Sequence, residues 1–564
     1  MSWRSVFDRL PNELYLSIFD YLNPIDLLYS FSNLNFRFNS LLKSYSCLTC
    51  KSIDLTKLNP HVFQYYCSLQ QLNNEIYSIK LNNNQLKFLS FSSNNKLTRL
   101  NFLLENDYHL YLNDQFIIKN LQILKVRHHA LTWQKPLIIC QYLQQVAIHL
   151  RNHWDLIDLL NSLPIVEKVH ATIDYDVTSC RDSSSLEGFS YSNKLKDFSY
   201  IIHSNHGLIY FVTDYSVIEL LIQNLTNLLK LRLYIIGCMN TIIDGYRLEN
   251  NLLKFLPKLN KFDIFIQSYG GNQIKSMEQF HSFKWNFASY TNQLTDMHFL
   301  FTLPFKFQYL HECLNEYFIN SIKTNFQKSN ENLLNMNYVK HVDLSCSITE
   351  NFIILIQKSF PSLESICFSS STTEYLCSTS LHRQSHYLIN SIRTIIFQHS
   401  SLNLIPFIRH LPNLNKLILN QSLLNHLLEK IDLIYISQIT ELHVYKFQRH
   451  SLENILNGFP NIRHLILKTL QTNDEPPVRS FIDNRCHHKH RPISACDILE
   501  EVFKKKLNQL EKIEIGCYFE RDEQNLEGIL SRLITKYIRI NTKFHINTED
   551  YKSTRCGSIQ ILFF

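Results

Sequence analysis

Apolar residues through most of the chain recur in a six-residue pattern, apolar-x-x-apolar-x-apolar. Its second half alternates apolar and free positions, as expected of a short β-strand with one buried face. About sixteen copies occur, many of them roughly 21–30 residues apart, a spacing typical of a structural repeat. The copies are Ile76/Ile79/Leu81, Leu97/Leu100/Phe102, Leu121/Leu124/Val126, Leu143/Val146/Ile148, Val166/Val169/Ala171, Leu195/Phe198/Tyr200, Leu228/Leu231/Leu233, Leu259/Phe262/Ile264, Leu294/Met297/Phe299, Val339/Val342/Leu344, Leu363/Ile366/Phe368, Ile392/Ile395/Phe397, Leu414/Leu417/Leu419, Ile439/Leu442/Val444, Ile462/Leu465/Leu467 and Leu510/Ile513/Ile515.

Helical patterns separate several of these predicted strands. They cover residues 217–225, 352–360, 423–434 and 452–456. Many strands follow a proline, which stops a helix before the chain extends. These entries are Leu163-Pro164, Leu256-Pro257, Phe360-Pro361, Leu411-Pro412 and Phe459-Pro460. We expect Gly458 to close the helix at 452–456 in a left-handed conformation.

One parallel strand and one helix per repeat resemble the leucine-rich repeat proteins in an irregular form. The resemblance implies an α/β solenoid, a horseshoe with parallel strands on its concave face. The consensus Asn or Cys after each strand is mostly absent. Two inserts interrupt the rhythm, near residues 300–338 and 470–508; the first includes an expected helical segment at 305–322, and the second is polar at 471–496.

The N-terminal residues follow a helical pattern instead. Leu14, Ile18, Tyr21 and Leu22 recur at helical spacing after Pro11, which suits a first helical turn. Residues 23–26 (Asn-Pro-Ile-Asp) predict a second helix start. A second apolar stripe follows at Leu27, Phe31, Leu34 and Phe38, ending in Leu41-Leu42. Two or three short helices cannot bury this much apolar surface among themselves, so we expect an exposed patch that binds a partner.

This segment resembles the F-box, the adaptor-binding module of cullin-type ubiquitin ligases. The matching residues are Leu10-Pro11, Glu13, Leu14, Ile18-Phe19, Leu22, Asn23-Pro24, Asp26, Leu27-Leu28 and Asn35-Phe36-Arg37-Phe38. Phe38 stands where the family usually has Trp. The resemblance implies a three-helix F-box domain at residues 1–48, followed by the repeats at 49–564. It also implies that a Skp-type adaptor, and cullin through it, binds Leu10, Pro11, Leu14, Ile18, Phe19, Leu22, Leu27 and Leu28.

Composition limits the class of protein, the partners and the compartment that we expect for this chain. Hydrophobic residues make up 45% of the 564 positions, enough for a large core. The net charge of +7 comes from interspersed signs and does not argue for nucleic acid or a membrane surface. The 14 cysteines are scattered, and the first residues lack the apolar stretch of a signal peptide. We therefore expect a protein of the cytoplasm or nucleus, with no membrane and no nucleic acid as partner.

No catalytic constellation is evident, and we expect neither enzymatic activity nor a cofactor. Cys486, His487, His488, His490 and Cys496 lack the paired spacing of a zinc site, and Cys47 and Cys50 lack a second pair nearby. Gly270-Gly271 is read as a turn, because no Lys-Ser/Thr follows it. Only 10 glycines occur, which counts against nucleotide-binding folds.

The free positions of the predicted strands mix charges. Basic residues lie there at Lys230, Arg232, Lys261 and Lys416; acidic residues and histidines lie at Asp197, Asp263, Asp296, His298, His341, Asp343, Glu441, His443 and His464. Partners of repeat arrays usually dock on this face. The expected function is the substrate-recognition subunit of a cullin-type ubiquitin ligase, with a target protein of unknown identity on the repeats. The alternative is a leucine-rich-repeat scaffold without a ubiquitin role, whose N-terminal helices cap the solenoid.

Overall fold

The computed structural model has an α/β fold whose sheets are mostly parallel. It describes residues 10–22, 27, 30–31, 34–44, 53–54, 56, 78–82, 99–103, 121–127, 142–150, 152–174, 192–203, 215–239, 244–269, 277–292, 296–314, 318–326, 336–344, 349–368, 388–397, 405–430, 436–445, 447, 452–468, 502, 510–518, 544–550 and 556–563. The chain divides into two units, Met1–Thr302 with Lys323–Phe326 and Leu303–Ile322 with Gln327–Phe564. The division falls within the insert expected near residues 300–338.

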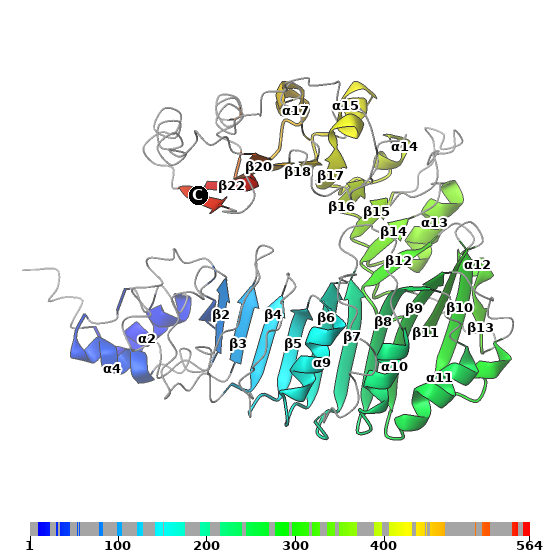
Figure 1. Ribbon diagram of the computed structural model, residues 1–564. Helices are drawn as coiled ribbons and strands as arrows, with labels where there is room; N and C mark the ends of the chain where they lie inside the picture. The colour runs from blue at the N-terminus through cyan, green and yellow to red at the C-terminus, as the bar shows by residue number, and fades with distance from the viewer. Residues whose placement is uncertain are drawn as a thin grey trace, which may run out of the picture. The chain divides into compact units, whose positions relative to one another are not determined.

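Most of the first unit is one sheet, to which the described part of the chain contributes twelve strands. Their spatial order is β1 (Ile53–Asp54), β2 (Ser78–Asn82), β3 (Arg99–Leu103), β4 (Ile123–Arg127), β5 (Gln145–Leu150), β6 (Lys168–Asp174), β7 (Asp197–His203), β8 (Lys230–Met239), β9 (Lys261–Tyr269), β11 (Met297–Leu303), β10 (Asn286–Asn292) and β13 (Lys323–Thr324). Strands β1 to β9 are parallel and follow chain order. Figure 1 shows β2 to β7 side by side, as the sequence pattern predicts.

Equivalent positions of the six-residue pattern face each other across the first sheet. Leu231 lies opposite Phe262, and Leu233 opposite Ile264, all four buried. The backbone hydrogen bonds at the second position also recur between neighbouring copies. In one example, the Glu167 carbonyl accepts hydrogen bonds from the backbone N–H groups of Lys196 and Asp197, at 2.9 and 3.1 Å. The register thus places the apolar pattern positions on one face. The third and fifth positions form the opposite face, which we call the outward face.

The last strands of the first sheet are not parallel. The pattern copy Leu294/Met297/Phe299 forms β11 as a strand, but β11 is antiparallel to β9, with Phe299 opposite Gln267. Strand β13 is also antiparallel to β10. The prediction of a parallel strand here is wrong, because alternation of buried positions does not encode strand direction. All seven residues of β11 are buried, so it lacks even the one-faced burial that the pattern implies.

The second unit contains a ten-stranded sheet, counted over the described residues. Its order is β12 (Tyr309–Leu314), β14 (His341–Leu344), β15 (Ser365–Phe368), β16 (Thr394–Phe397), β17 (Lys416–Asn420), β18 (Glu441–Tyr445), β19 (His464–Lys468), β20 (Lys512–Tyr518), β22 (Cys556–Phe563) and β21 (Phe544–Asp550). Strands β12 to β20 are parallel, whereas β22 is antiparallel to both β20 and β21. Again equivalent positions pair: the Asn415 carbonyl accepts from the N–H groups of Thr440 and Glu441, both at 2.9 Å.

Strand β12 corrects the helix expected at residues 305–322. Of the residues described in that range, only those of α12 (Phe318–Ser321) are helical. The pattern search misses β12 because Glu312 occupies the sixth, normally apolar position after Phe307 and Leu310. The pairing of β12 with β14 contains a register shift. Leu310 pairs with Val342, and Leu314, instead of Glu312, pairs with Leu344.

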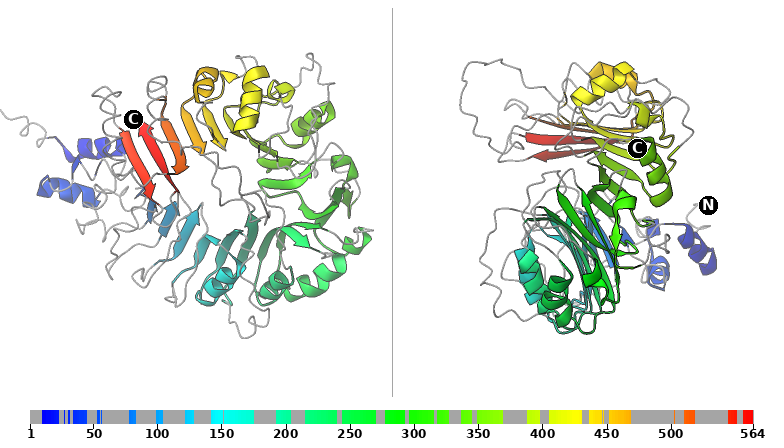
Figure 2. Two further views of the ribbon diagram at one scale, coloured as in Figure 1. Left: turned by 45° about the horizontal axis from the view of Figure 1, so that its top comes forward. Right: turned by 90° about the vertical axis from the view of Figure 1, so that its right-hand side faces the viewer.

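Helices connect the strands of both units. In the first they are α9 (His153–Asn161), α10 (Tyr215–Gln223), α11 (Gly245–Asn251), η2 (Leu253–Phe255) and η3 (Glu278–Phe280); in the second, α13 (Glu350–Ser359), α14 (Ile405–Ile408), α15 (Gln421–Lys430) and α17 (Leu452–Gly458). Figure 2 shows the yellow helices of the second unit along one face of its strands. This is the apolar face, because Phe407 of α14 packs edge-on against Phe368 of β15, with ring centroids 6.2 Å apart.

Side-chain caps set several helix starts. Asn152, Asp244 and Thr349 accept hydrogen bonds from backbone N–H groups three residues later, which begins α9, α11 and α13. Among the described residues no helix is long and apolar enough to cross a bilayer. The helices predicted at 217–225, 352–360, 423–434 and 452–456 correspond to α10, α13, α15 and α17, as far as the structure describes them.

Gly458 does not close α17 in a left-handed conformation, as the sequence predicts, but lies inside the helix with a negative φ. A Cβ atom there would lie 2.3 Å from Leu428 Cδ2 of α15. The glycine therefore allows α15 and α17 to approach each other. Gly245 has the same role in the first unit, where a Cβ would lie 2.6 Å from the Gln279 carbonyl oxygen.

Candidate functional site

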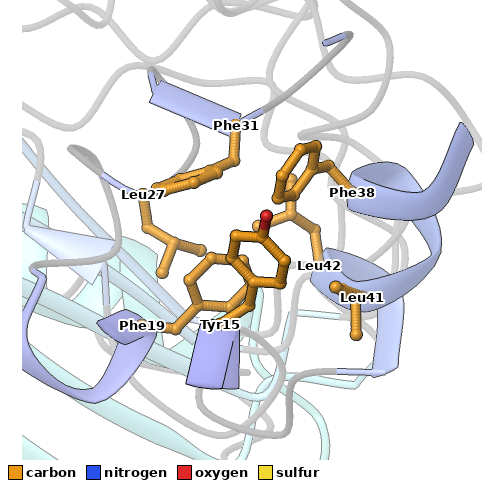
Figure 3. Packing of buried hydrophobic residues seen from close by; sticks show 7 residues of the cluster. All are labelled: Tyr15, Phe19, Leu27, Phe31, Phe38, Leu41 and Leu42. Carbon is orange, nitrogen blue, oxygen red and sulfur yellow. The ribbon is translucent and has the colours of Figure 1, made fainter. Parts of the chain in front are cut away.

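The N-terminal helices enclose a small aromatic core of their own. Helix α2 (Asn12–Tyr21) contributes Tyr15 and Phe19, and α4 (Phe36–Ser44) contributes Phe38. The Tyr15 and Phe38 rings meet edge to face at 4.8 Å, and Phe19 meets Phe31 at 4.9 Å. Figure 3 shows these rings converging together with the remaining core residues, Leu27, Leu41 and Leu42. All buried members of this core that the structure describes lie within residues 15–42.

Polar contacts of Arg37 hold α2 and α4 together. Its Nε donates to Asn12 Oδ1 at 2.9 Å, and its Nη2 donates to the Leu10 carbonyl. The guanidinium also lies 5.2 Å from the centre of the Tyr15 ring. Asn35 accepts from the Phe38 N–H and so caps α4. These contacts connect the N-terminal ends of α2 and α4.

A second face of α2, beside the one buried in the core, is apolar and exposed. Leu14 is 49% exposed, Ile18 36% and Tyr21 91%. They recur at helical spacing from the exposed Pro11, so they lie in one line on the helix. Phe36, the first residue of α4, is also exposed. Apolar side chains aligned on a helix whose other face is already buried form a candidate docking surface, which we call the α2 patch (Pro11, Leu14, Ile18, Tyr21).

The structure separates the predicted adaptor-binding residues that it describes into three groups. Pro11, Leu14 and Ile18 are exposed, and Leu10 and Leu22 are partly buried against the aromatic core. Phe19 and Leu27 are buried within that core, where they support the helices and have almost no surface for a partner. Leu28 and residues 23–26 lie outside the described residues.

The second apolar stripe is not continuous. Leu34 is exposed, whereas Leu27, Phe31 and Phe38 are buried. The reason is local: Leu34 and Asn35 precede α4, so the helical phase begins again at Phe36. The pattern treats the two helical stretches as one phase and so places Leu34 wrongly.

The outward faces of the two sheets form the other candidate surface. In the first sheet the third positions Lys168, Asp197, Lys230 and Lys261 stand in register on neighbouring strands. The fifth positions beside them are His170, Ser199, Arg232 and Asp263. Lys168 Nζ lies 3.2 Å from Asp197 Oδ2, and Arg232 Nη2 lies 3.6 Å from Asp263 Oδ2. Four cationic side chains thus share this surface with two carboxylates.

In the second sheet the charges on this face are paired more tightly. Asp343 is buried and accepts from Tyr309 Oη at 3.0 Å, and its other oxygen lies 2.5 Å from His311 Nδ1. Glu441 lies 2.6 Å from Lys416 Nζ and 2.7 Å from His443 Nε2. The sequence identifies Asp343 but misses Tyr309 and His311, because β12 carries them and is read as helix.

Hydrogen bonds and burial shift several pKa values in the second sheet. The hydrogen bonds from His443 and Lys416 lower the pKa of Glu441 to about 2, against the opposing effect of burial. Burial lowers the pKa of His341. The pKa of Glu364 is lowered by its hydrogen bond from Lys340. These carboxylates are therefore ionised and already partnered by neighbouring strands.

Within the described ranges no group of His, Cys, Asp and Glu is arranged to hold a metal ion. Cys47, Cys50, Gly270-Gly271 and the Cys/His cluster of residues 486–496 lie outside those ranges, and their interpretation stays a prediction. The sequence matches no protein-family model and no curated protein.

Proposed function

We propose that this chain is the substrate receptor of a Skp–cullin–F-box ubiquitin ligase. In this proposal residues 1–48 act as the F-box, and the α2 patch binds a Skp-type adaptor, which connects the chain to cullin. The remaining residues form an irregular leucine-rich-repeat solenoid that binds a target protein. The chain makes and breaks no bond; it raises the concentration of its target near a ubiquitin-loaded partner.

The exposure of Leu14 and Ile18 carries the proposal. Tyr15 and Phe19 of this helix fill the aromatic core, whereas Leu14 and Ile18 beside them stay partly exposed. Burial of an aliphatic side chain contributes about 1.5–3 kcal/mol, so leaving two of them in water has a cost that a bound partner removes. The F-box resemblance supplies the identity of that partner.

The repeat part of the proposal rests on register. From β2 to β9 and from β14 to β20, equivalent pattern positions pair on neighbouring strands. Parallel neighbours joined by helices on one face leave the other face free along the array, which suits target binding.

The test is capture of a Skp-type adaptor by the full-length chain. We expect Leu14→Glu combined with Ile18→Glu to weaken capture at least about tenfold, since hot-spot truncation costs about 2 kcal/mol or more and burying the new charges adds to it. The matched control is Leu220→Glu with Leu388→Glu, two exposed leucines outside residues 1–48, which should leave capture unchanged.

Two results would overturn the proposal. One is a wild-type chain that does not bind the adaptor; the other is a Leu14/Ile18 variant that binds it as well as the control. In the alternative, where these helices cap a scaffold, the same variant lowers the unfolding temperature of the chain and no adaptor binding exists to lose. Circular dichroism melting of all three proteins distinguishes the two functions.

A further inference from the structure

The outward face of β6 to β9 carries unbalanced positive charge on a rigid support. Its third and fifth positions hold Lys168, Lys230, Arg232 and Lys261 against Asp197 and Asp263. The buried apolar residues Val169, Phe198, Leu231 and Phe262 alternate with them, which fixes the charged side chains on the opposite face. We call this the β6–β9 basic surface (Lys168, His170, Lys230, Arg232, Lys261).

Lys230 and Lys261 are the least compensated members. They pair directly in register, are both exposed, and make no ion pair with any described residue. Neighbouring strands are about 4.8 Å apart, and like charges directly opposite each other destabilise a sheet. Asp197 also stands opposite Lys230 in the register, but its carboxylate contacts Lys168, and the carboxylate of Asp263 contacts Arg232, so neither forms an ion pair with Lys230 or Lys261.

The pKa of His170 is affected by the same positive charges. Burial lowers its pKa, the charges of Arg232 and Lys168 lower it further, and Asp197 opposes them. The second sheet offers a contrast at the equivalent third positions, where Lys416 lies 2.6 Å from Glu441. The second sheet thus pairs its cations with carboxylates, whereas β6–β9 of the first sheet hold more cations than carboxylates.

We propose that the β6–β9 basic surface binds an extended protein segment rich in Asp and Glu. This rests on the proposed function, because it gives the class of target segment that the repeats take. Four strands span about 14 Å, the length of about four extended residues, so one short segment can reach Lys168, Lys230 and Lys261 together.

A peptide fits this surface better than a nucleic acid. Asp197 and Asp263 lie among the cations. A nucleic acid has a negative charge at every unit, so its phosphates would be repelled by both carboxylates. A peptide can place a neutral or basic residue opposite each Asp and its acidic residues opposite the lysines.

The experiment measures fluorescence anisotropy of a short labelled peptide in which Asp and Glu alternate with Ser, mixed with the full-length chain. The comparison peptide has Asn and Gln in place of the acids, and a single-stranded RNA of equal length is the third probe. We expect binding of the acidic peptide alone, weakening as salt increases. Lys230→Glu with Lys261→Glu should weaken it at least about tenfold, the equivalent of 1.4 kcal/mol.

Two further variants keep the test decisive. Lys254→Glu with Lys358→Glu makes the same charge change at exposed lysines on η2 and α13, and should leave binding unchanged. Lys230→Gln with Lys261→Gln removes the charges without reversing them, and should give an intermediate affinity. Melting curves show that each variant is folded.

The proposal is overturned if the wild-type chain ignores the acidic peptide, binds the amide peptide equally, or prefers the RNA. It also fails if the Lys254/Lys358 control loses as much affinity as the Lys230/Lys261 variant. Adaptor capture by the same proteins separates this from the proposed function: the Lys230/Lys261 variant should still capture the adaptor, and the Leu14/Ile18 variant should still bind the peptide.

Discussion

The two sheets follow the same rules for their apolar positions and differ on their outward faces. In each, a leucine, isoleucine or phenylalanine pairs with its equivalent on the next strand, as Leu231 does with Phe262 and Leu442 with Leu465. Outward, the first sheet leaves Lys230 and Lys261 unpaired among the described residues, while the second encloses Asp343 and Glu441 between partners. The apolar pattern therefore sets the strands, and the free positions are where the two units can diverge in what they bind.

The largest effects should come from the shared apolar positions. Leu231→Ala and Leu442→Ala each remove a fully buried side chain, so we expect a loss of about 2–5 kcal/mol in the free energy of unfolding. Hydrogen exchange read by mass spectrometry should show lost protection in β7–β9 for the first variant and in β17–β19 for the second. If either variant loosens both sheets equally, the units are not separate and the comparison breaks.

A smaller, unequal effect should follow from the fifth-position carboxylates. Asp343→Asn weakens the contacts with His311 and Tyr309 in a buried position, and should cost about 1–3 kcal/mol of stability. Asp263→Asn affects a longer, 3.6 Å ion pair to a partly exposed arginine, so we expect a loss below about 1 kcal/mol. Urea unfolding of both variants measures the difference.

The same two variants also test the difference in charge between the outward faces of the two sheets. Asp263→Asn removes a negative charge beside Arg232 and should strengthen binding of the acidic peptide, whereas Asp343→Asn should not change it. Equal stability losses, or weaker peptide binding by the Asp263 variant, would contradict this view of the two faces.

The smallest effect should be the pH dependence contributed by Glu441. Its pKa is lowered from 4.5 to about 2, so the ionised form stabilises the folded state above pH 4.5, and that contribution disappears as the pH falls to about 2. Since the side chain is partly exposed, we expect Glu441→Gln to cost about 0.5 kcal/mol at neutral pH. Urea midpoints of wild type and variant should converge in acid; a gap that persists at the lowest pH would show that packing, and not charge, is responsible.

Much of the strand layout was accessible from the sequence. The copies Leu195/Phe198/Tyr200 and Leu414/Leu417/Leu419 correspond to β7 and β17, because a strand with one buried face needs alternating apolar residues wherever it lies. Strand β12 was missed because Glu312 breaks the pattern and a register shift repairs it. In the N-terminal helices, Tyr15 and Phe19 rather than Leu14 and Ile18 face the core, a choice between two apolar faces that helical spacing alone cannot make.

The sequence by itself determined which residues of most strands face inward, since burial of alternate positions depends only on local spacing. Only the tertiary structure decided the antiparallel ends at β11 and β22, the division into two units, and which charges are compensated. These features depend on residues distant in the chain: Asp343 contacts His311 of β12, and Lys230 lies beside Lys261. Because Coulomb interactions and strand pairing follow spatial neighbours, they appear only when the strands are placed side by side.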